Sequence, residues 1–163
     1  MRRSIGLAIA LVFVLAGSLC ARPADTAALE RLLAEEWEGA WTSGNVNRLL
    51  PLFTEDVVYE DVTFGAVAKG QEALRKFAAD SFDTFPGAVF EVKSRFVSPD
   101  GKWGAVEWVW RGRQAKDMPG LPATNKDFEL RGASVVEFRD GKISRNSDYW
   151  DLETYRKRVG LIK

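Results

Sequence analysis

Between residues 25 and 82 the apolar positions recur mainly at helical spacing. Asp25-Thr26 can cap a helix, and apolar residues then follow three or four positions apart, at Leu29, Leu32, Leu33, Trp37, Ala40 and Trp41. Ser43-Gly44-Asn45 is predicted to end this helix, and a short second helix is expected to turn Leu49, Leu50, Leu52 and Phe53 inward. Residues 71–82 return to the helical period. Between these helices, the pattern predicts a strand over 57–62 and a turn-rich passage over 65–70.

From residue 90 onward the period changes to two, which is typical of strands. Phe90, Val92, Ser94 and Phe96 are expected on one face of a strand, and Ser98-Pro99-Asp100-Gly101 predicts a hairpin into a second strand over 103–114. After a loop, a strand is predicted over 128–138, and Asp140-Gly141 turns the chain into a last strand over 143–150. Consecutive antiparallel strands preceded by helices predict one α+β domain, with the helices on one face of a curled sheet.

The first 20 residues have the pattern of an export signal. Arg2 and Arg3 precede an uncharged run, residues 4–21, that is rich in Leu, Ile, Val and Ala. Residues 1–20 are therefore predicted to be a signal peptide, and the protein to be periplasmic, envelope-anchored or secreted. A retained membrane anchor is the alternative, because the run approaches the roughly 18 residues of a spanning helix. Residues 16–20 also resemble a lipoprotein box, so that either Cys20 is lipidated or an ordinary cut precedes Ala21.

Charge and composition exclude several classes of function. The chain has 23 Lys and Arg against 23 Asp and Glu and no basic run, so nucleic acid is not expected as a partner. It has no histidine, and its one cysteine lies in the predicted leader, which removes His-dependent nucleophiles and thiolate metal sites from the folded domain. Any catalysis must use carboxylates, Tyr, Lys or Arg. We expect neither a cofactor nor a metal site.

Two parts of the chain resemble ketosteroid isomerases and their SnoaL-like relatives in the nuclear transport factor 2-like superfamily. Trp41-Thr42-Ser43-Gly44-Asn45 and Val57-Val58-Tyr59-Glu60-Asp61 are similar to the end of their first helix and to their first strand. Phe128-Glu129-Leu130-Arg131-Gly132-Ala133-Ser134 and Asp148-Tyr149-Trp150-Asp151 are similar to the sheet of SnoaL-like proteins. The resemblance implies, for residues 21–163, a cone-shaped curved antiparallel sheet wrapped around N-terminal helices, with one apolar pocket.

The same resemblance assigns candidate catalytic residues. Asp61 stands where ketosteroid isomerases keep the aspartate that moves a proton, whereas Trp37 and Ser134 replace the Tyr and Asp that stabilise the enolate. Steroid isomerisation by that mechanism is therefore not expected. A carboxylate at the mouth of an apolar pocket would be partly desolvated, which raises its pKa and makes it a usable base.

A second relative supplies another aspartate. The last strand is similar to that of limonene-1,2-epoxide hydrolases, in which the residue at the place of Asp148 helps to activate water. Trp108 and Trp110 take the places of the arginine and second aspartate of that triad, so the hydrolase mechanism is not expected either. Asp61 and Asp148 remain as a pair whose pKa values can separate into an acid and a base.

Two hypotheses for the function follow from these residues. One is an enzyme that uses Asp61 and Asp148 for isomerisation, cyclisation or hydration of a small hydrophobic molecule; the other is a non-catalytic ligand-binding or dimerisation module of the cell envelope. In both, a homodimer is expected. The predicted ligand-contacting residues are Trp37, Trp41, Tyr59, Trp108, Trp110, Ser134, Val136 and Trp150.

Overall fold

The computed structural model describes residues 25–163. The predicted leader over residues 1–20, and with it Cys20, lies outside this part of the chain. Within residues 25–163, no helix combines the length and the apolar composition that a membrane crossing requires.

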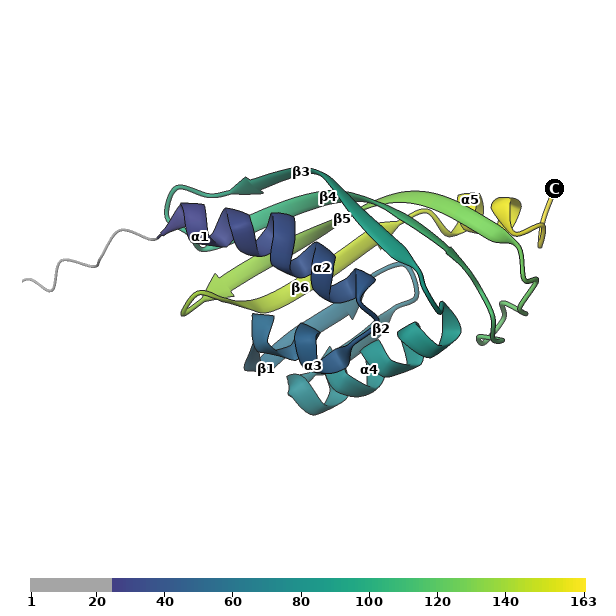
Figure 1. The fold of residues 1–163 in the computed structure, drawn as a ribbon, viewed down its shortest axis with the longest axis horizontal. Coiled ribbons are helices and arrows are strands. Elements are labelled where there is room, and N and C mark those ends of the chain that lie inside the picture. Colours follow the sequence, from purple (N-terminus) through teal and green to yellow (C-terminus); the bar gives the residue numbers. More distant parts are fainter. Residues whose placement is uncertain (1–24) are drawn as a thin grey trace, which may run out of the picture.

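The N-terminal helical segment consists of α1 (Thr26–Arg31), the π-helical turn η1 (Leu32–Glu36) and α2 (Trp37–Thr42). As the sequence predicts, the Asp25 side chain caps its start by accepting a hydrogen bond of 3.0 Å from the backbone N–H of Ala28. The segment buries Leu33, Trp37 and Trp41 along one side. It lies across the concave side of the sheet in Figure 1. The apolar helical period therefore becomes the helical layer over the sheet.

The following segment differs from the prediction at its strands. After α3 (Val46–Leu49) and η2 (Leu50–Leu52), strand β1 (Phe53–Asp61) begins four residues before the predicted strand over 57–62. The passage over 65–70, predicted to be turn-rich, contains strand β2 (Ala66–Lys69), which pairs with β1 antiparallel. Helix α4 (Gly70–Thr84) follows. The sequence pattern does not predict β2, because this strand is short and only its residue Ala68 is buried.

Six strands form one curved sheet in the order β2-β1-β6-β5-β4-β3 (Figure 1). The remaining strands are β3 (Val89–Val97), β4 (Trp103–Arg113), β5 (Asp127–Arg139) and β6 (Lys142–Trp150), and α5 (Leu152–Arg158) follows β6. The predicted α+β class is confirmed. The sheet is mixed instead of purely antiparallel, because β1 runs parallel to β6, with Asp61 opposite Asp148. This one parallel contact brings the two predicted catalytic aspartates together.

Strand β3 contains a bulge, after which each side chain points to the face opposite to the one that simple alternation predicts. The register with β4 shifts between Val92 and Ser94. Phe90 and Val92 pack against the core, but Phe96 is 59% exposed and Val97 is buried. The prediction that Ser94 and Phe96 share the face of Phe90 was therefore wrong, because one extra residue changes the phase of every later side chain.

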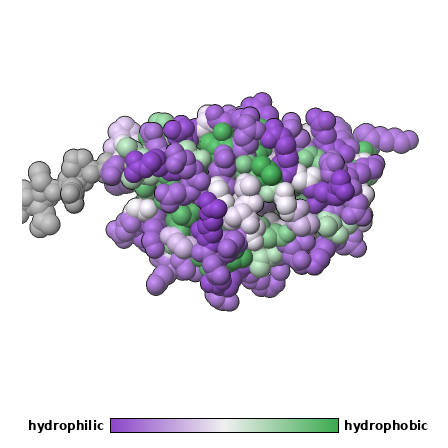
Figure 2. Space-filling view, viewed as in Figure 1, coloured by the Kyte–Doolittle hydropathy of each residue, from purple (hydrophilic) through white to green (hydrophobic). Residues whose placement is uncertain are grey.

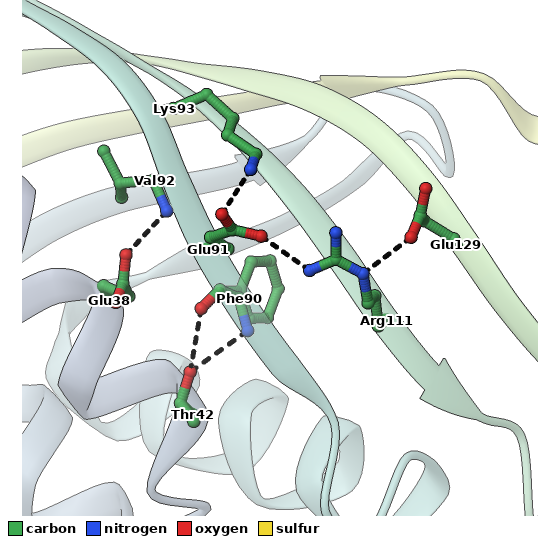
Figure 3. A network of polar contacts seen from close by, with 8 residues as sticks. All are labelled: Glu38, Thr42, Phe90, Glu91, Val92, Lys93, Arg111 and Glu129. Carbon is green, nitrogen blue, oxygen red and sulfur yellow. Dashed lines mark hydrogen bonds and ion pairs between the residues drawn. The ribbon is translucent and has the colours of Figure 1, made fainter.

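Side chains of α2 hold this edge strand in place (Figure 3). The Thr42 hydroxyl accepts a hydrogen bond of 3.0 Å from the Phe90 N–H and donates one of 3.3 Å to the Phe90 carbonyl. Glu38 accepts a hydrogen bond of 2.6 Å from the Val92 N–H, immediately before the bulge. These side chains take the place of a further strand at the sheet edge.

Candidate active site

Asp61 occupies the last position of β1 and is 8% exposed. Its Oδ1 accepts a hydrogen bond of 2.9 Å from the backbone N–H of Phe64, and its Oδ2 accepts one of 3.2 Å from the indole N–H of Trp150. Burial raises the pKa of the Asp61 carboxyl, and these two hydrogen bonds together with one from the Thr63 backbone lower it by less. Asp61 is thus a fixed, desolvated carboxyl group.

A cleft of about 390 Å³ opens beside Asp61. It lies between the end of α4, the loop after β4, and the ends of β1 and β6; Figure 1 shows that loop running beside the end of α4. Its apolar wall consists of Phe64, Phe77, Phe85, Trp110, Met118, Pro119 and Trp150. Its polar lining consists of Asp61, Asp80, Ser81, Asp83, Thr84, Lys116 and Asp117. The size and the aromatic wall suit a small hydrophobic molecule.

Gln114 stabilises the loop that forms one wall of the cleft. This side chain is fully buried, and its amide donates hydrogen bonds of 2.8 Å to the Lys116 carbonyl and 2.7 Å to the Leu121 carbonyl. The hydroxyl of Tyr155 in α5 donates to the Gln114 oxygen. Met118 and Leu121 also exchange backbone hydrogen bonds. These contacts fix the part of the loop that forms the cleft wall.

Asp148 lies opposite Asp61 in the β1–β6 pair, at the centre of a buried network. Its Oδ1 accepts hydrogen bonds of 2.6 Å from Ser134 and 2.6 Å from Asn146, and its Oδ2 accepts one from the Tyr59 hydroxyl. The indole N–H of Trp108 donates to the Ser134 hydroxyl over 2.9 Å. Three hydrogen-bond donors therefore compensate for the desolvation of the Asp148 carboxyl group.

The protonation states of Asp148 and of its neighbours Asp61 and Tyr59 depend on one another. Burial raises the pKa of Asp148 to about 6, although its three hydrogen bonds lower it, and the charge of Asp61 adds to the rise. The pKa of Tyr59 also rises well above its ordinary value, first because of burial and then because of the charge of Asp148. The tyrosine hydroxyl consequently stays protonated and serves as a donor to Asp148.

A smaller cavity of about 70 Å³ adjoins the cleft, with Ser81, Phe85 and Trp110 common to both. It is lined further by Trp41 and Phe90. Figure 2 shows a hollow bordered by weakly polar and apolar residues where the end of α2 lies near α4 and β3, within a largely hydrophilic face. Among the described residues, the indole N–H groups of Trp41 and Trp110 have no hydrogen-bond partner. Both N–H groups are buried, so the tryptophans contribute aromatic surface to the cavity lining.

The family model of the SnoaL-like domain matches residues 25–146 of this chain. The chain belongs to the SnoaL-like domain family. The match spans the helical layer, the cleft residues of α4 and most of the sheet.

Solved structures agree with this SnoaL-like fold. TsrD from Streptomyces laurentii superposes with a TM-score of 0.74 and 20% identity, covering 85% of this chain and 99% of that one. A Catenulispora acidiphila protein with a ketosteroid isomerase-like fold, in complex with trimethylamine, gives a TM-score of 0.68 and 23% identity over 78% of this chain and 92% of that one. A polyketide cyclase candidate from Xanthomonas campestris pv. campestris gives 0.70 and 23%, over 82% and 97%. At these identities the likeness establishes the nuclear transport factor 2-like fold.

The predicted site residues of the SnoaL-like domain lie in three places: the cleft, the adjoining cavity and the core. Asp61, Trp110 and Trp150 line the cleft, and Trp41 lines the adjoining cavity with Trp110. The others are buried in the core and are absent from the cleft wall: Trp37, Tyr59, Trp108, Ser134, Val136 and Asp148. The Ser134 hydroxyl already donates to Asp148, so in this arrangement it has no proton to offer a ligand.

Eleven of the fourteen residues that line the cleft were missing from the sequence-based list. Phe77 and Asp83 come from α4, Phe85 is the C-cap of that helix, and Asp117 and Met118 come from the loop. An apolar Met in a Pro- and Gly-containing loop is one signal that could have drawn attention to this segment, because exposed loops rarely retain such residues without a contact. No comparable signal separates Asp83 from an ordinary surface carboxylate.

Within residues 25–163, no group of three or more His, Cys, Asp or Glu side chains is placed to hold a metal ion. What the arrangement can do is move a proton at Asp61 beside a bound apolar molecule.

Proposed function

We propose that this SnoaL-like domain binds a small hydrophobic molecule in the cleft and catalyses cofactor-free acid–base chemistry on it, such as isomerisation, cyclisation or hydration. The observation that carries the proposal is the position of Asp61, a desolvated carboxyl in the wall of an aromatic cleft. Burial raises its pKa, which makes its carboxylate a stronger base than an exposed aspartate.

In this proposal, Asp61 is the group that exchanges a proton with the ligand. Each carboxylate oxygen has two acceptor positions, and the bonds from Phe64 and Trp150 use one on each oxygen. The backbone of Thr63 uses a third position, so one is left for the proton in transfer. The two bonds fix the plane of the carboxyl group, so little reorganisation is needed when the ligand binds.

Asp148 has a positioning role in this proposal instead of direct contact with the ligand. It stands opposite Asp61 across the parallel β1–β6 pair and is enclosed by its three donors. The negative charge of Asp61 raises the pKa of Asp148, so the two carboxyl groups do not ionise independently.

A binding module without turnover is the second candidate function. It is supported by the enclosure of Asp148 and Ser134, which leaves Asp61 as the one predicted catalytic carboxyl in the cleft wall. In that case the cleft holds a ligand through its aromatic wall, and Asp61 serves as a hydrogen-bond acceptor.

One experiment separates the two functions. Tryptophan fluorescence of the domain is titrated with sterols, polyketides and terpenoids, and the same samples are analysed for products by mass spectrometry. The enzyme proposal expects a new product that Asp61→Asn abolishes while quenching by the ligand persists, with Asp100→Asn in the β3–β4 hairpin as a control of equal charge change. Saturable quenching without any product in the wild type and in both variants would support the binding module instead.

We also propose that two copies pair through the outer face of the sheet. Side chains of β3–β6 expose apolar surface there: Phe96 is 59% exposed, Trp103 49%, Val135 39% and Tyr149 48%. Val135 stands opposite Ala105 on β4, which in turn stands opposite Phe96, so the patch is continuous. Sedimentation analysis tests the pairing: Val135→Glu should give monomers, and Ile162→Glu, at an exposed apolar position after α5, should not. A monomeric wild type would refute it.

Export of the chain, with residues 1–20 as a signal peptide, is proposed separately. Cell fractionation and the mass of the mature N-terminus test it. A Cys20→Ala variant that stays in the membrane fraction would exclude lipidation as the anchor.

A further inference from the structure

The cleft combines an aromatic wall with an excess of carboxylates. Phe64, Phe77, Phe85, Trp110 and Trp150 supply the aromatic faces. The ionisable side chains of the lining are four aspartates and one lysine, Lys116. An apolar molecule that enters the cleft therefore meets π faces and negative charge together.

The partners of these charges show which carboxylates are uncompensated. Lys116 pairs with Asp83, and Asp80 pairs with Lys76 over 2.8 Å outside the cleft lining. None of the ion pairs among residues 25–163 involves the other two lining carboxylates, Asp61 and Asp117. The exposed Asp117 instead accepts a backbone N–H from the loop over 2.7 Å, so its position is fixed. The lining offers no cation that is free to receive an anionic ligand.

We infer that the cleft selects a small hydrophobic molecule that carries a protonated amine. This rests on the proposed role of the cleft as the ligand site. The ammonium group lies at the mouth, near Asp117, and the hydrocarbon skeleton lies against the aromatic wall. A cation gains from the carboxylates and from the faces of the indole and phenyl rings, whereas a carboxylate on the same skeleton is repelled. A neutral analogue keeps only the apolar contacts.

Three probes with one skeleton test this selection: 1-adamantylmethylamine, 1-adamantylmethanol and 1-adamantanecarboxylate. Their dissociation constants are measured at pH 7 and low ionic strength by tryptophan fluorescence, because Trp110 and Trp150 form part of the wall. The amine should bind about 10-fold more tightly than the alcohol, and the carboxylate more weakly than both. The preference should shrink as salt is added.

Variants of equal charge change locate the effect. Asp117→Asn keeps the oxygen that accepts the loop N–H but removes the charge, and should lower the amine-to-alcohol affinity ratio about threefold. Asp140→Asn, in the β5–β6 turn, removes the same charge far along the sheet at a position with φ of 53°, which Asn tolerates. Its affinity ratio should equal that of the wild type.

The outcomes separate this inference from the proposed function. If the alcohol binds as tightly as the amine, or if Asp117→Asn leaves the ratio unchanged, the amine selection is wrong while the cleft remains a ligand site. If none of the three probes quenches the fluorescence, the amine selection is wrong, and the titration with sterols, polyketides and terpenoids decides the proposed function separately.

Discussion

Replacement of Asp148 by Asn should remove a pH-dependent loss of stability. The pKa of Asp148 is about 6 in the folded domain and 3.8 in its unperturbed form. Because the folded state holds this proton more tightly, the contribution of the group to stability is fully present below pH 3.8. It is lost as the pH rises through about 6. A difference of about two pKa units corresponds to about 3 kcal/mol over the whole titration, of which about 2 kcal/mol falls between pH 4 and pH 7.

The assay is urea unfolding of the wild type and Asp148→Asn at pH 4, 5, 6 and 7, followed by tryptophan fluorescence. The difference in unfolding free energy between the two proteins cancels the titration of the surface carboxylates that they share. That difference should move by about 2 kcal/mol in favour of the variant as the pH rises from 4 to 7. A difference that stays constant with pH would show that Asp148 is not desolvated in the folded state, and the reasoning from its burial would be refuted.

Three further changes test individual contacts. Trp150→Phe removes a hydrogen bond that lowers the pKa of Asp61, so the ¹³C carboxyl resonance of Asp61 should titrate at a higher pH than in the wild type; an unchanged midpoint would contradict this. Gly132→Ala places a Cβ in steric overlap with the Trp108 ring and should destabilise the domain by about 1–3 kcal/mol in urea unfolding. The loss should be smaller in a Trp108→Phe background if the clash is the cause. Thr42→Val removes the two hydrogen bonds to β3 and should destabilise by about 1–2 kcal/mol and speed hydrogen exchange along that strand; unchanged exchange would mean that the pairing with β4 alone holds it.

Local patterns were sufficient where one residue decides a structure by itself. The Asp25 cap, the Asp140-Gly141 turn and the alternation of β5 follow from side-chain and backbone preferences that act over a few positions. The β3 bulge did not follow, because the register shift after Val92 depends on contacts with β4 and on Glu38 of α2. Periodicity alone extends a strand without such an interruption, and it therefore placed Phe96 on the wrong face.

The α+β class, the helical layer, the family resemblance and the two aspartates of interest can all be inferred from the amino-acid sequence. The difference between these aspartates becomes visible in the folded domain: Asp61 lies in the cleft wall, whereas Asp148 is enclosed by three donors from three different strands. Strand alternation places a side chain on the inner face of a sheet but does not say whether that point of the face meets a cavity or the core. That distinction depends on how α4 and the loop after β4 cover the sheet, which is set by contacts between residues far apart in the chain.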